Sequence, residues 1–407
     1  MRGPWGAMRG LDPLLRRNLL ADVGVNAGAG LTMALVGVIL PVVARREGVD
    51  ALGLALFATA GFLANILTLF AGRVGIRSPR GLVGFRIAGG ICLVLMLVFP
   101  APATLVLLCL GFWLSIALAS PFQVRLWGQI YPAGVRGRLV GVVGTGRAAS
   151  AAVGALVGGL LADRIGGLQV IALGGILGML LGSLAWRLVV PAGDDAPPYD
   201  LRGSLRALTG SPRLRRVLVA QWFQGAGFVI AAPLYAFVHV DRLDLSLSEV
   251  GVLGILTAGA TTLACIPWGG LVDRRGGSRV FLLGSVFAVI ALVLYAWAPA
   301  YPVLWVAAVA TGICNASVEI ATQATIGECV PAGERTAAMA GWSAVLGIRG
   351  VLAPFIGTTL LALGIVDVAG GIAIGAGSAV LGVLLFRSAV RRPVRTGRAM
   401  EAGLPNG

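Results

Sequence analysis

The sequence contains no lysine and few charged residues of any kind. Charged side chains make up 12% of its 407 residues, whereas hydrophobic residues make up 57%. A soluble globular protein carries about 25% charged residues, so this chain lacks the polar surface that keeps a fold of this size in water. The composition excludes a soluble globular protein and predicts a membrane protein. The use of arginine alone, together with 61 glycines, indicates a GC-rich bacterial genome.

Residues that build metal centres and active sites are also scarce. The chain has one histidine, His239, and five cysteines that all fall in or at the ends of long apolar runs. A lone histidine without a thiolate or carboxylate cluster is a poor metal site, and cysteines inside apolar runs do not indicate a disulfide framework. An intramembrane enzyme would need paired aspartates, a Ser-His pair or a metal cluster. We therefore expect neither an enzyme nor a cofactor, and interpret His239 as a membrane-interface residue.

The sequence does contain a series of long apolar runs. We count twelve of about 18 or more residues, from 19–44 to 368–386, a length that crosses a bilayer as a helix. With the N-terminus inside, 24 of the 32 arginines lie in inner segments and four in outer loops. The positive-inside rule then places both termini in the cytoplasm. We predict an all-α protein with twelve spans in the bacterial plasma membrane, whose net charge of +15 marks the inner leaflet and does not indicate nucleic-acid binding.

The chain repeats itself with a shift of 199 residues. The shift aligns residues 13–28 with 212–227 and gives eight identities in sixteen positions, where about one or two are expected by chance. We therefore predict two parallel six-helix bundles, residues 1–186 and 217–390, and a cytoplasmic tail, residues 391–407. The linker, residues 187–216, has Leu201, Leu205 and Leu208 at helical spacing, which predicts a short amphipathic helix on the inner leaflet.

The loop between the eighth and ninth runs carries a motif. It reads Gly269, Gly270, Leu271, Val272, Asp273, Arg274, Arg275, Gly276, Gly277, Ser278 and Arg279. This order, in a chain of two fused six-span halves, resembles the major facilitator superfamily of secondary transporters, although Gly277 and Ser278 replace the family's first basic pair. The resemblance implies a gating motif formed by Gly269, Leu271, Asp273, Arg274, Gly276 and Arg279. In it, Asp273 would cap a helix across the domain interface, where the helix dipole stabilises a carboxylate, and hold the inner gate shut.

Two further details bear on this resemblance. The corresponding loop of the first half has Gly72 where the acid should be, so only the second-half motif is complete. The run from Gly154 to Gly159 resembles the Gly-Pro-x-x-Gly-Gly element of the family's proton antiporters, with Ala155 in place of the proline. The same glycines would also serve close helix packing without antiport.

Polar side chains within the predicted spans are the candidate substrate-binding and coupling residues, because a charge in hydrocarbon costs at least about 2.5 kcal/mol. Arg147 and Arg349 lie deep in spans five and eleven at related places, and we expect them to face one central cavity. Glu319 reaches a similar depth, where it either carries the coupling proton or forms a static salt bridge with an arginine. Arg86 lies near the cytoplasmic edge, where arginine reaches lipid headgroups. The other candidates are Asp22, Asn26, Gln123, Gln224 and Asn315.

These expectations favour a secondary transporter that exports a small organic solute by alternating access, coupled to protons. We expect it to work as a monomer among membrane lipids. Two alternatives stay open. Uptake of a small organic anion is mildly favoured by the arginines within the spans, and a sensor or scaffold with the same fold would move no solute.

Overall fold

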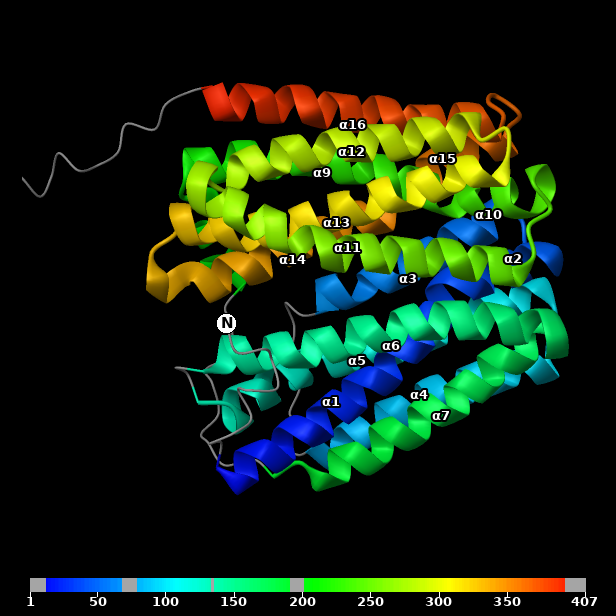
Figure 1. Cartoon of the computed structure of the whole chain (residues 1–407), viewed down its shortest axis with the longest axis horizontal. Helices are drawn as coiled ribbons and strands as arrows, with labels where there is room; N and C mark the ends of the chain where they lie inside the picture. The colour runs from blue at the N-terminus through cyan, green and yellow to red at the C-terminus, as the bar shows by residue number, and fades with distance from the viewer. Residues whose placement is uncertain (1–11, 68–78, 133–134, 191–200, 392–407) are drawn as a thin grey trace, which may run out of the picture.

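Every regular element in the computed structural model, which describes residues 12–67, 79–132, 135–190 and 201–391, is a helix. The first half contains α1 (Pro13–Ala34), η2 (Leu35–Ile39), α2 (Leu40–Arg46), α3 (Ala51–Leu67), α4 (Pro79–Val98), α5 (Pro102–Ile130), α6 (Arg136–Ile165) and α7 (Gly167–Leu188). The rest contains α8 (Leu201–Thr209), α9 (Pro212–Ala231), η4 (Ala232–Leu234), α10 (Tyr235–Phe237), η5 (Val238–Arg242), α11 (Leu247–Arg275), α12 (Gly277–Trp297), α13 (Tyr301–Cys329), η6 (Ala332–Glu334), α14 (Arg335–Leu352), α15 (Pro354–Ala362) and α16 (Val368–Arg391). The long helices run alongside one another between the same two ends of the molecule (Figure 1).

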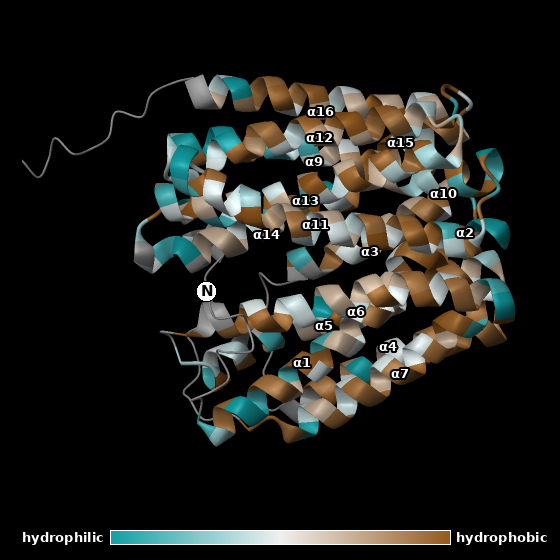
Figure 2. Cartoon of the chain, in the orientation of Figure 1, coloured by the Kyte–Doolittle hydropathy of each residue, from teal (hydrophilic) through white to brown (hydrophobic). Residues whose placement is uncertain are grey.

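Ten helical stretches of the described residues are long and apolar enough to cross a membrane. Two shorter apolar stretches, Ala51–Leu63 and Leu82–Val98, fall on the second and third predicted spans. The all-helical, multi-pass architecture is therefore confirmed, whereas the count of twelve spans stays a prediction. Figure 2 shows hydrophobic residues along the middle of the helices and hydrophilic residues gathered at both ends.

The two halves begin their first long helix in the same way. Asp12 precedes Pro13, and its carboxylate accepts hydrogen bonds from two N–H groups of the first turn at 3.1 and 3.4 Å. Ser211 precedes Pro212, and its hydroxyl accepts one such bond at 3.4 Å. Proline suits the first helical position because the N–H that it lacks would be unpaired there, and the preceding side chain caps the next groups. The 199-residue shift therefore relates two helix starts of the same construction.

The predicted linker helix is present as α8, and its place on the inner leaflet stays a prediction. Ser204 and Leu208 of α8 are buried, and α8 packs against α14. The approach is close because Gly341 of α14 has no side chain, and a Cβ atom there would lie 2.8 Å from the carbonyl oxygen of Ser204. Ser204, Ala207 and Leu208 of α8 are thus covered by protein, whereas Leu205 is 42% exposed. Residues 191–200 of the linker, the loop that contains Gly72 and residues 392–407 of the tail lie outside the described residues.

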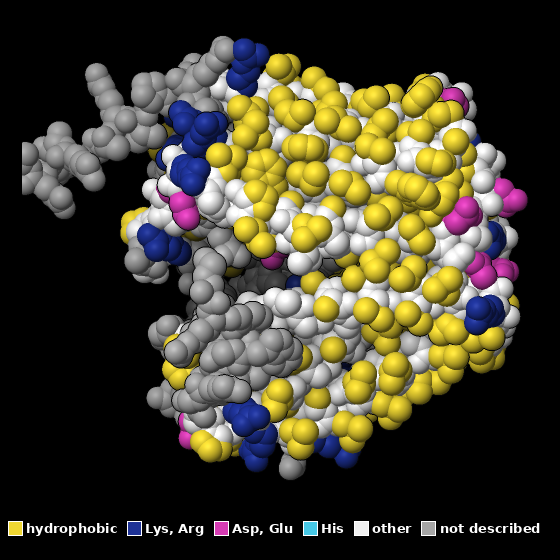
Figure 3. All heavy atoms as spheres, viewed as in Figure 1, with side chains coloured by type: hydrophobic (Ala, Val, Ile, Leu, Met, Phe, Trp, Pro, Cys, Tyr) yellow, Lys and Arg dark blue, Asp and Glu magenta, His cyan; other side chains and the backbone are white. Residues whose placement is uncertain are grey.

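Three large clusters of buried apolar side chains show how the halves are joined. One cluster contains residues of both halves, such as Leu35 and Leu234, at the predicted outer end. The other two lie toward the predicted cytoplasmic end, one around Trp186 in the first half and one around Trp342 in the second. The halves therefore share a core at one end and have separate cores at the other. Figure 3 shows the surface hollowed between them at the arginine-rich end, while acidic side chains gather at the opposite end.

Candidate functional site

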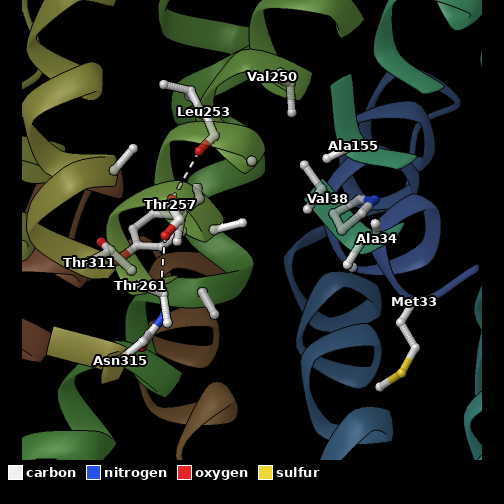
Figure 4. Close-up of a pocket in the computed structure, with 18 of the residues that line it drawn as sticks. Met33, Ala34, Val38, Ala155, Val250, Leu253, Thr257, Thr261, Thr311 and Asn315 are labelled. Atoms are coloured by element: carbon white, nitrogen blue, oxygen red, sulfur yellow. Dashed lines mark hydrogen bonds between the residues drawn. The ribbon is translucent and has the colours of Figure 1, made fainter. Parts of the chain in front are cut away.

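A cavity of about 550 Å³ lies between the two halves. The first half contributes α1, η2, α2 and α6, and the second contributes the segment from η4 to η5 together with α11, α12 and α13. Most of the lining is apolar, and no arginine or carboxylate belongs to it among the described residues. In Figure 4, Met33, Ala34 and Val38 face Thr257, Thr261, Thr311 and Asn315 across the space. The size and the lining suit a small organic molecule without net charge.

Three ring side chains of the second half form one wall of the cavity. The rings of Tyr235 and Tyr295 stack with their centroids 3.9 Å apart, and His239 Nε2 lies 3.4 Å from the Tyr295 hydroxyl. The buried Tyr235 hydroxyl has no hydrogen-bond partner in the described part of the chain. An unpaired buried hydroxyl costs about 1–3 kcal/mol, so a molecule that gains access to it on binding recovers this energy. His239 is buried in the cavity wall, and the expectation of an interface position is wrong because its ring packs against Tyr295.

The threonines that α11 and α13 of the second half contribute to the cavity are prepared to accept hydrogen bonds. Each donates its hydroxyl hydrogen to a carbonyl one turn earlier in its own helix: Thr257 at 2.9 Å, Thr261 at 2.8 Å, Thr262 at 3.0 Å and Thr311 at 2.8 Å. The hydroxyl oxygens keep lone pairs for a further donor. The Asn315 amide can both donate and accept. The cavity thus offers several acceptors and a few donors, all of them uncharged.

At the predicted outer end of the cavity, α6 and α11 approach each other at glycines. A side chain on Gly159 would collide with the carbonyl oxygen of Leu247, and one on Gly251 would collide with the carbonyl oxygen of Ala155. Gly154 and Gly158 likewise leave room for the side chains of Leu31 in α1 and Leu35 in η2. The glycine run of α6 therefore brings this helix against both the first span and the second half of the chain.

Asp163, at the end of α6, reinforces this contact between the two halves. Its carboxylate accepts hydrogen bonds from the N–H groups of Leu247 and Ser248, both at 2.8 Å, in the first turn of α11. A carboxylate is favoured at this position by the helix dipole. Sequence reasoning missed Asp163, although an acid at the outer end of a span, near a helix start with the capping residue Ser246, was the available signal.

Two arginines add to the same contact. Arg45 forms an ion pair with Asp241 at 2.9 Å, and its guanidinium lies 4.2 Å from the ring centroid of Phe237. Arg46 donates a hydrogen bond to the carbonyl oxygen of Leu245. At this predicted outer end the two halves are therefore held together by side chains as well as by the shared apolar core.

Asp22, a predicted coupling residue, is fully buried inside the first half. Its carboxylate accepts hydrogen bonds from Trp127 Nε1 at 2.7 Å, the Tyr131 hydroxyl at 2.8 Å and Asn26 Nδ2 at 2.9 Å. Gln123 in turn donates to Asn26 Oδ1 at 3.1 Å. The structure therefore brings three predicted residues together and adds two aromatic donors that the sequence did not single out.

Arg349 is buried inside the second half, with 6% of its surface exposed. Its Nη1 atom donates to the backbone carbonyl of Gln221 at 2.9 Å and to Gln221 Oε1 at 2.7 Å. The guanidinium occupies the space left by the missing side chain of Gly225. The expectation that Arg349 faces the central cavity is wrong, because Gly225 and Gln221 supply room and acceptors within its own bundle.

Arg86 also points into the protein. Its side chain packs against Gly182 of α7, and its Nε is buried without a hydrogen-bond partner among the described residues. The Nε atom of Arg86 therefore lies inside the first bundle and not at lipid headgroups, contrary to the prediction, because Gly182 leaves room for the side chain.

The remaining candidates lie apart from one another. Asn315 lines the cavity, whereas Gln224 is buried and donates to Cys314 Sγ at 3.4 Å. Arg147 and Glu319 are exposed, do not line the cavity, and form no ion pair with each other or with Arg349. Of the gating motif, Gly276 ends α11 with a positive φ of 79°, and Asp273, Arg274 and Arg279 are exposed at the predicted cytoplasmic end beside Gly269 and Leu271.

Comparison with known proteins gives one family and one fold. Residues 217–404 match the model of the Major Facilitator Superfamily, and no curated protein sequence matches the chain. The nucleoside transporter NupG has 14% identity and a TM-score of 0.71 over 94% of this chain and 100% of its own. A POT family transporter in complex with a thioalcohol-conjugated peptide has 13% identity and a TM-score of 0.72 over 92% and 97%.

A bacterial homologue of the human lysosomal transporter Spinster, in an inward-facing and occupied conformation, has 17% identity and a TM-score of 0.62 over 94% of this chain and 96% of its own. At these identities each structure shows the fold alone. The family match covers the second half, and the shared fold covers both halves, which the 199-residue repeat relates. The second half of the chain therefore matches the major facilitator superfamily, and the chain as a whole has the fold of solved transporters.

Proposed function

We propose that this protein is a secondary transporter that moves a small uncharged organic solute across the bacterial plasma membrane by alternating access. The observation that carries the proposal is the cavity of about 550 Å³ between the halves, lined from both sides by apolar and uncharged polar groups. A solute held between two bundles changes sides when one bundle rocks against the other.

The positive-inside rule assigns the arginine-rich end to the cytoplasm. The hollow at that end and the contacts of Asp163 and Arg45 at the other then correspond to an inward-facing state. Asp273 is exposed in this state. We infer that it engages a helix of the first half only when the inner end closes, as the gating motif implies.

The lining also bears on the class of solute. No ionised group faces the cavity among the described residues, so uptake of an organic anion finds no cation there to pair with its charge. The threonine oxygens, the Asn315 amide and the unpaired Tyr235 hydroxyl fit a neutral molecule with several hydrogen-bonding groups. A nucleoside, the solute named for NupG, has this chemistry, and nucleosides are therefore the first probes to use.

Proton coupling and export complete the proposal. We assign the proton to Asp22, with Glu319 as the second candidate. A proton on Asp22 would add a fourth donor to a carboxyl group that already faces three, so the network must rearrange. Because α1 carries both Asp22 and the cavity residues Met33 and Ala34, such a rearrangement links proton binding to the solute. Export follows the likeness of the α6 glycine run to the antiporter element.

The test begins with thermal-shift measurements on the purified full chain against nucleosides, organic anions and organic cations. Nucleosides should stabilise the protein and the ions should not. In proteoliposomes with an imposed pH gradient, the stabilising nucleoside should move, and Asp22→Asn should abolish the dependence on the gradient. Stabilisation by anions alone would contradict the solute class, and binding without movement under any gradient would favour the sensor or scaffold.

Tyr235→Phe tests the cavity itself. It removes only the unpaired hydroxyl, so the fold should be unaffected while nucleoside affinity falls by about 10-fold, the equivalent of one hydrogen bond. Tyr301→Phe is the matched control, because the Tyr301 hydroxyl bonds to the carbonyl of Glu249 at 2.9 Å outside the cavity. Equal affinity in the wild type and Tyr235→Phe would show that the solute does not use this wall.

A further inference from the structure

A groove of about 400 Å³ lies between the first turns of α9 and the last turns of α16, at the predicted cytoplasmic end. It is lined by Pro212, Arg215, Arg216, Val219, Leu385 and Ser388. Arg215 and Arg216 are exposed. Val219 lies about 10 Å farther along α9 than Pro212 and is 49% exposed. The groove therefore combines positive charge at its mouth with an apolar wall deeper in the membrane.

The three arginines in the first turns of α9 differ in their surroundings. Arg213 points into the protein, where it pairs with Glu328 at 2.7 Å and lies 3.3 Å from Ser278 Oγ. Arg216 donates from Nε to the carbonyl of Pro212 at 3.2 Å, and neither it nor Arg215 forms an ion pair with an acid of the described residues. The charge of Arg215 and Arg216 is thus not compensated by the protein.

The walls of the groove are fixed by tight packing of the same two helices. Farther along, a Cβ atom on Gly382 of α16 would lie 2.6 Å from the backbone nitrogen of Gln224. Ser378 of α16 donates to the carbonyl of Phe223 at 2.7 Å. Ser388 donates to the carbonyl of Leu385 at 2.7 Å, which leaves its oxygen free to accept. The shape of the groove is therefore fixed by the close packing of α9 against α16.

We propose that this groove binds the headgroup of an anionic phospholipid of the inner leaflet. The lipid phosphate lies between Arg215 and Arg216, a headgroup hydroxyl donates to Ser388, and an acyl chain follows Val219 and Leu384, which is 56% exposed. Basic pockets between spanning helices at the cytoplasmic side attract anionic headgroups through charge complementarity. A zwitterionic lipid has no net charge to match these arginines.

The first half provides the matched control. The 199-residue shift places Arg16 and Arg17 opposite the two groove arginines, and both are exposed. The residues opposite Leu385 and Ser388 are Trp186 and Val189, which are buried and carry no hydroxyl. The same charges thus stand at the same depth without the groove's hydroxyl, so this pair measures the effect of surface charge alone.

The experiment measures the unfolding temperature of the purified full chain in detergent with added phosphatidylglycerol, phosphatidylcholine or inorganic phosphate. Phosphatidylglycerol should raise it, and the other two should leave it unchanged. Arg215→Ala/Arg216→Ala should weaken phosphatidylglycerol binding by about 30-fold, from about 1 kcal/mol for each arginine. Arg16→Ala/Arg17→Ala should leave the binding close to that of the wild type.

Ser388→Leu keeps both arginines and fills the groove, so it should also remove most of the stabilisation by phosphatidylglycerol, whether or not the double alanine variant folds. The proposal is overturned if both arginine pairs weaken binding equally, because surface charge then suffices. It is also overturned if phosphatidylcholine or phosphate stabilises as much as phosphatidylglycerol, or if Ser388→Leu binds phosphatidylglycerol like the wild type.

Discussion

The polar centres of the two halves occupy corresponding places but have opposite charges. The 199-residue shift puts Asp22 opposite Gln221 and Asn26 opposite Gly225. In the first half a buried carboxylate is surrounded by neutral donors. In the second half a buried guanidinium, that of Arg349, is held by the neutral acceptors of Gln221 in the space beside Gly225.

This difference shows how a duplicated frame holds opposite charges at corresponding places. In each half the ionised group is held by its own bundle, and neither group crosses to the cavity between them. A buried charge needs partners wherever the sequence places it, and each half supplies those partners locally. The halves can therefore move against each other without breaking either centre, and the charge of each centre remains available for a separate role.

The largest expected effect is that of Asp22→Ala. It removes the carboxylate that accepts from Trp127 Nε1 and the Tyr131 hydroxyl, whereas Asn26 Nδ2 keeps its bond to the backbone carbonyl of residue 22 at 2.9 Å. Each lost bond to a buried carboxylate costs about 1–3 kcal/mol, so the free energy of unfolding in detergent should fall by about 2 kcal/mol or more. Gln221→Ala, the corresponding change in the second half, keeps the backbone acceptor of Arg349 and should cost about 1–2 kcal/mol. A larger cost for Gln221→Ala would break the comparison.

Gly225→Ala tests the second centre. The added methyl group collides with the guanidinium of Arg349, and overpacking of this kind costs about 1–3 kcal/mol. In an Arg349→Ala background the same substitution should cost less than about 0.5 kcal/mol, because the colliding group is gone. A double-mutant cycle measures this coupling. Additive costs would contradict the idea that the missing side chain of Gly225 makes room for the guanidinium of Arg349.

Asp163→Ala addresses how the halves meet. The 199-residue shift places Ala362 opposite Asp163, so the second half has no acid with which to form the corresponding contact. Losing an acid that caps a helix start costs about 0.5–2 kcal/mol, which should raise the outward-facing population by about 2- to 30-fold. The rate at which an impermeant thiol reagent labels a cysteine placed at Thr311 from outside reports this population. Arg164→Ala, at the exposed neighbouring residue, should leave the rate unchanged.

The smallest effect is expected for Asp241→Asn. Its partner Arg45 is 26% exposed and Asp241 is 42% exposed, and exposed ion pairs contribute about 0–1 kcal/mol. The labelling rate at Thr311 should rise by less than about 5-fold, and added salt should remove the difference because it screens exposed charges. A larger effect than that of Asp163→Ala would reverse the order of the two outer contacts.

The sequence predicted the architecture well because that architecture depends on periodic and local features. Apolar runs, the 199-residue repeat and the capping residues Asp12 and Ser211 are all visible in one dimension. The site was predicted less well because depth along a helix does not give the direction of a side chain. Arg349 has the expected depth, but Gly225, on another helix, decides where its guanidinium lies.

Tyr235 and Asp163 were not predicted because their importance depends on neighbours that are distant in the sequence. Tyr235 looks like any aromatic residue of a span, and its importance comes from a hydroxyl that no described neighbour pairs. Asp163 looks like a loop acid, and its role depends on a helix start 84 residues away in the chain. Asn315 was found because an amide within a span near the cavity is rare enough to stand out.

At the contact of Gly159 with α11 and of Gly251 with α6, no side chains lie between the two backbones. We infer that the second half turns here against the first as a unit in which α11 stays packed on α13. From Gly251 to its end at Arg275, α11 extends about 36 Å toward the predicted cytoplasmic end. A rotation of about 10° would move the far end of an arm of this length by about 6 Å. A small change at the glycine contact would thereby become a large displacement of the last turn of α11, which carries Asp273.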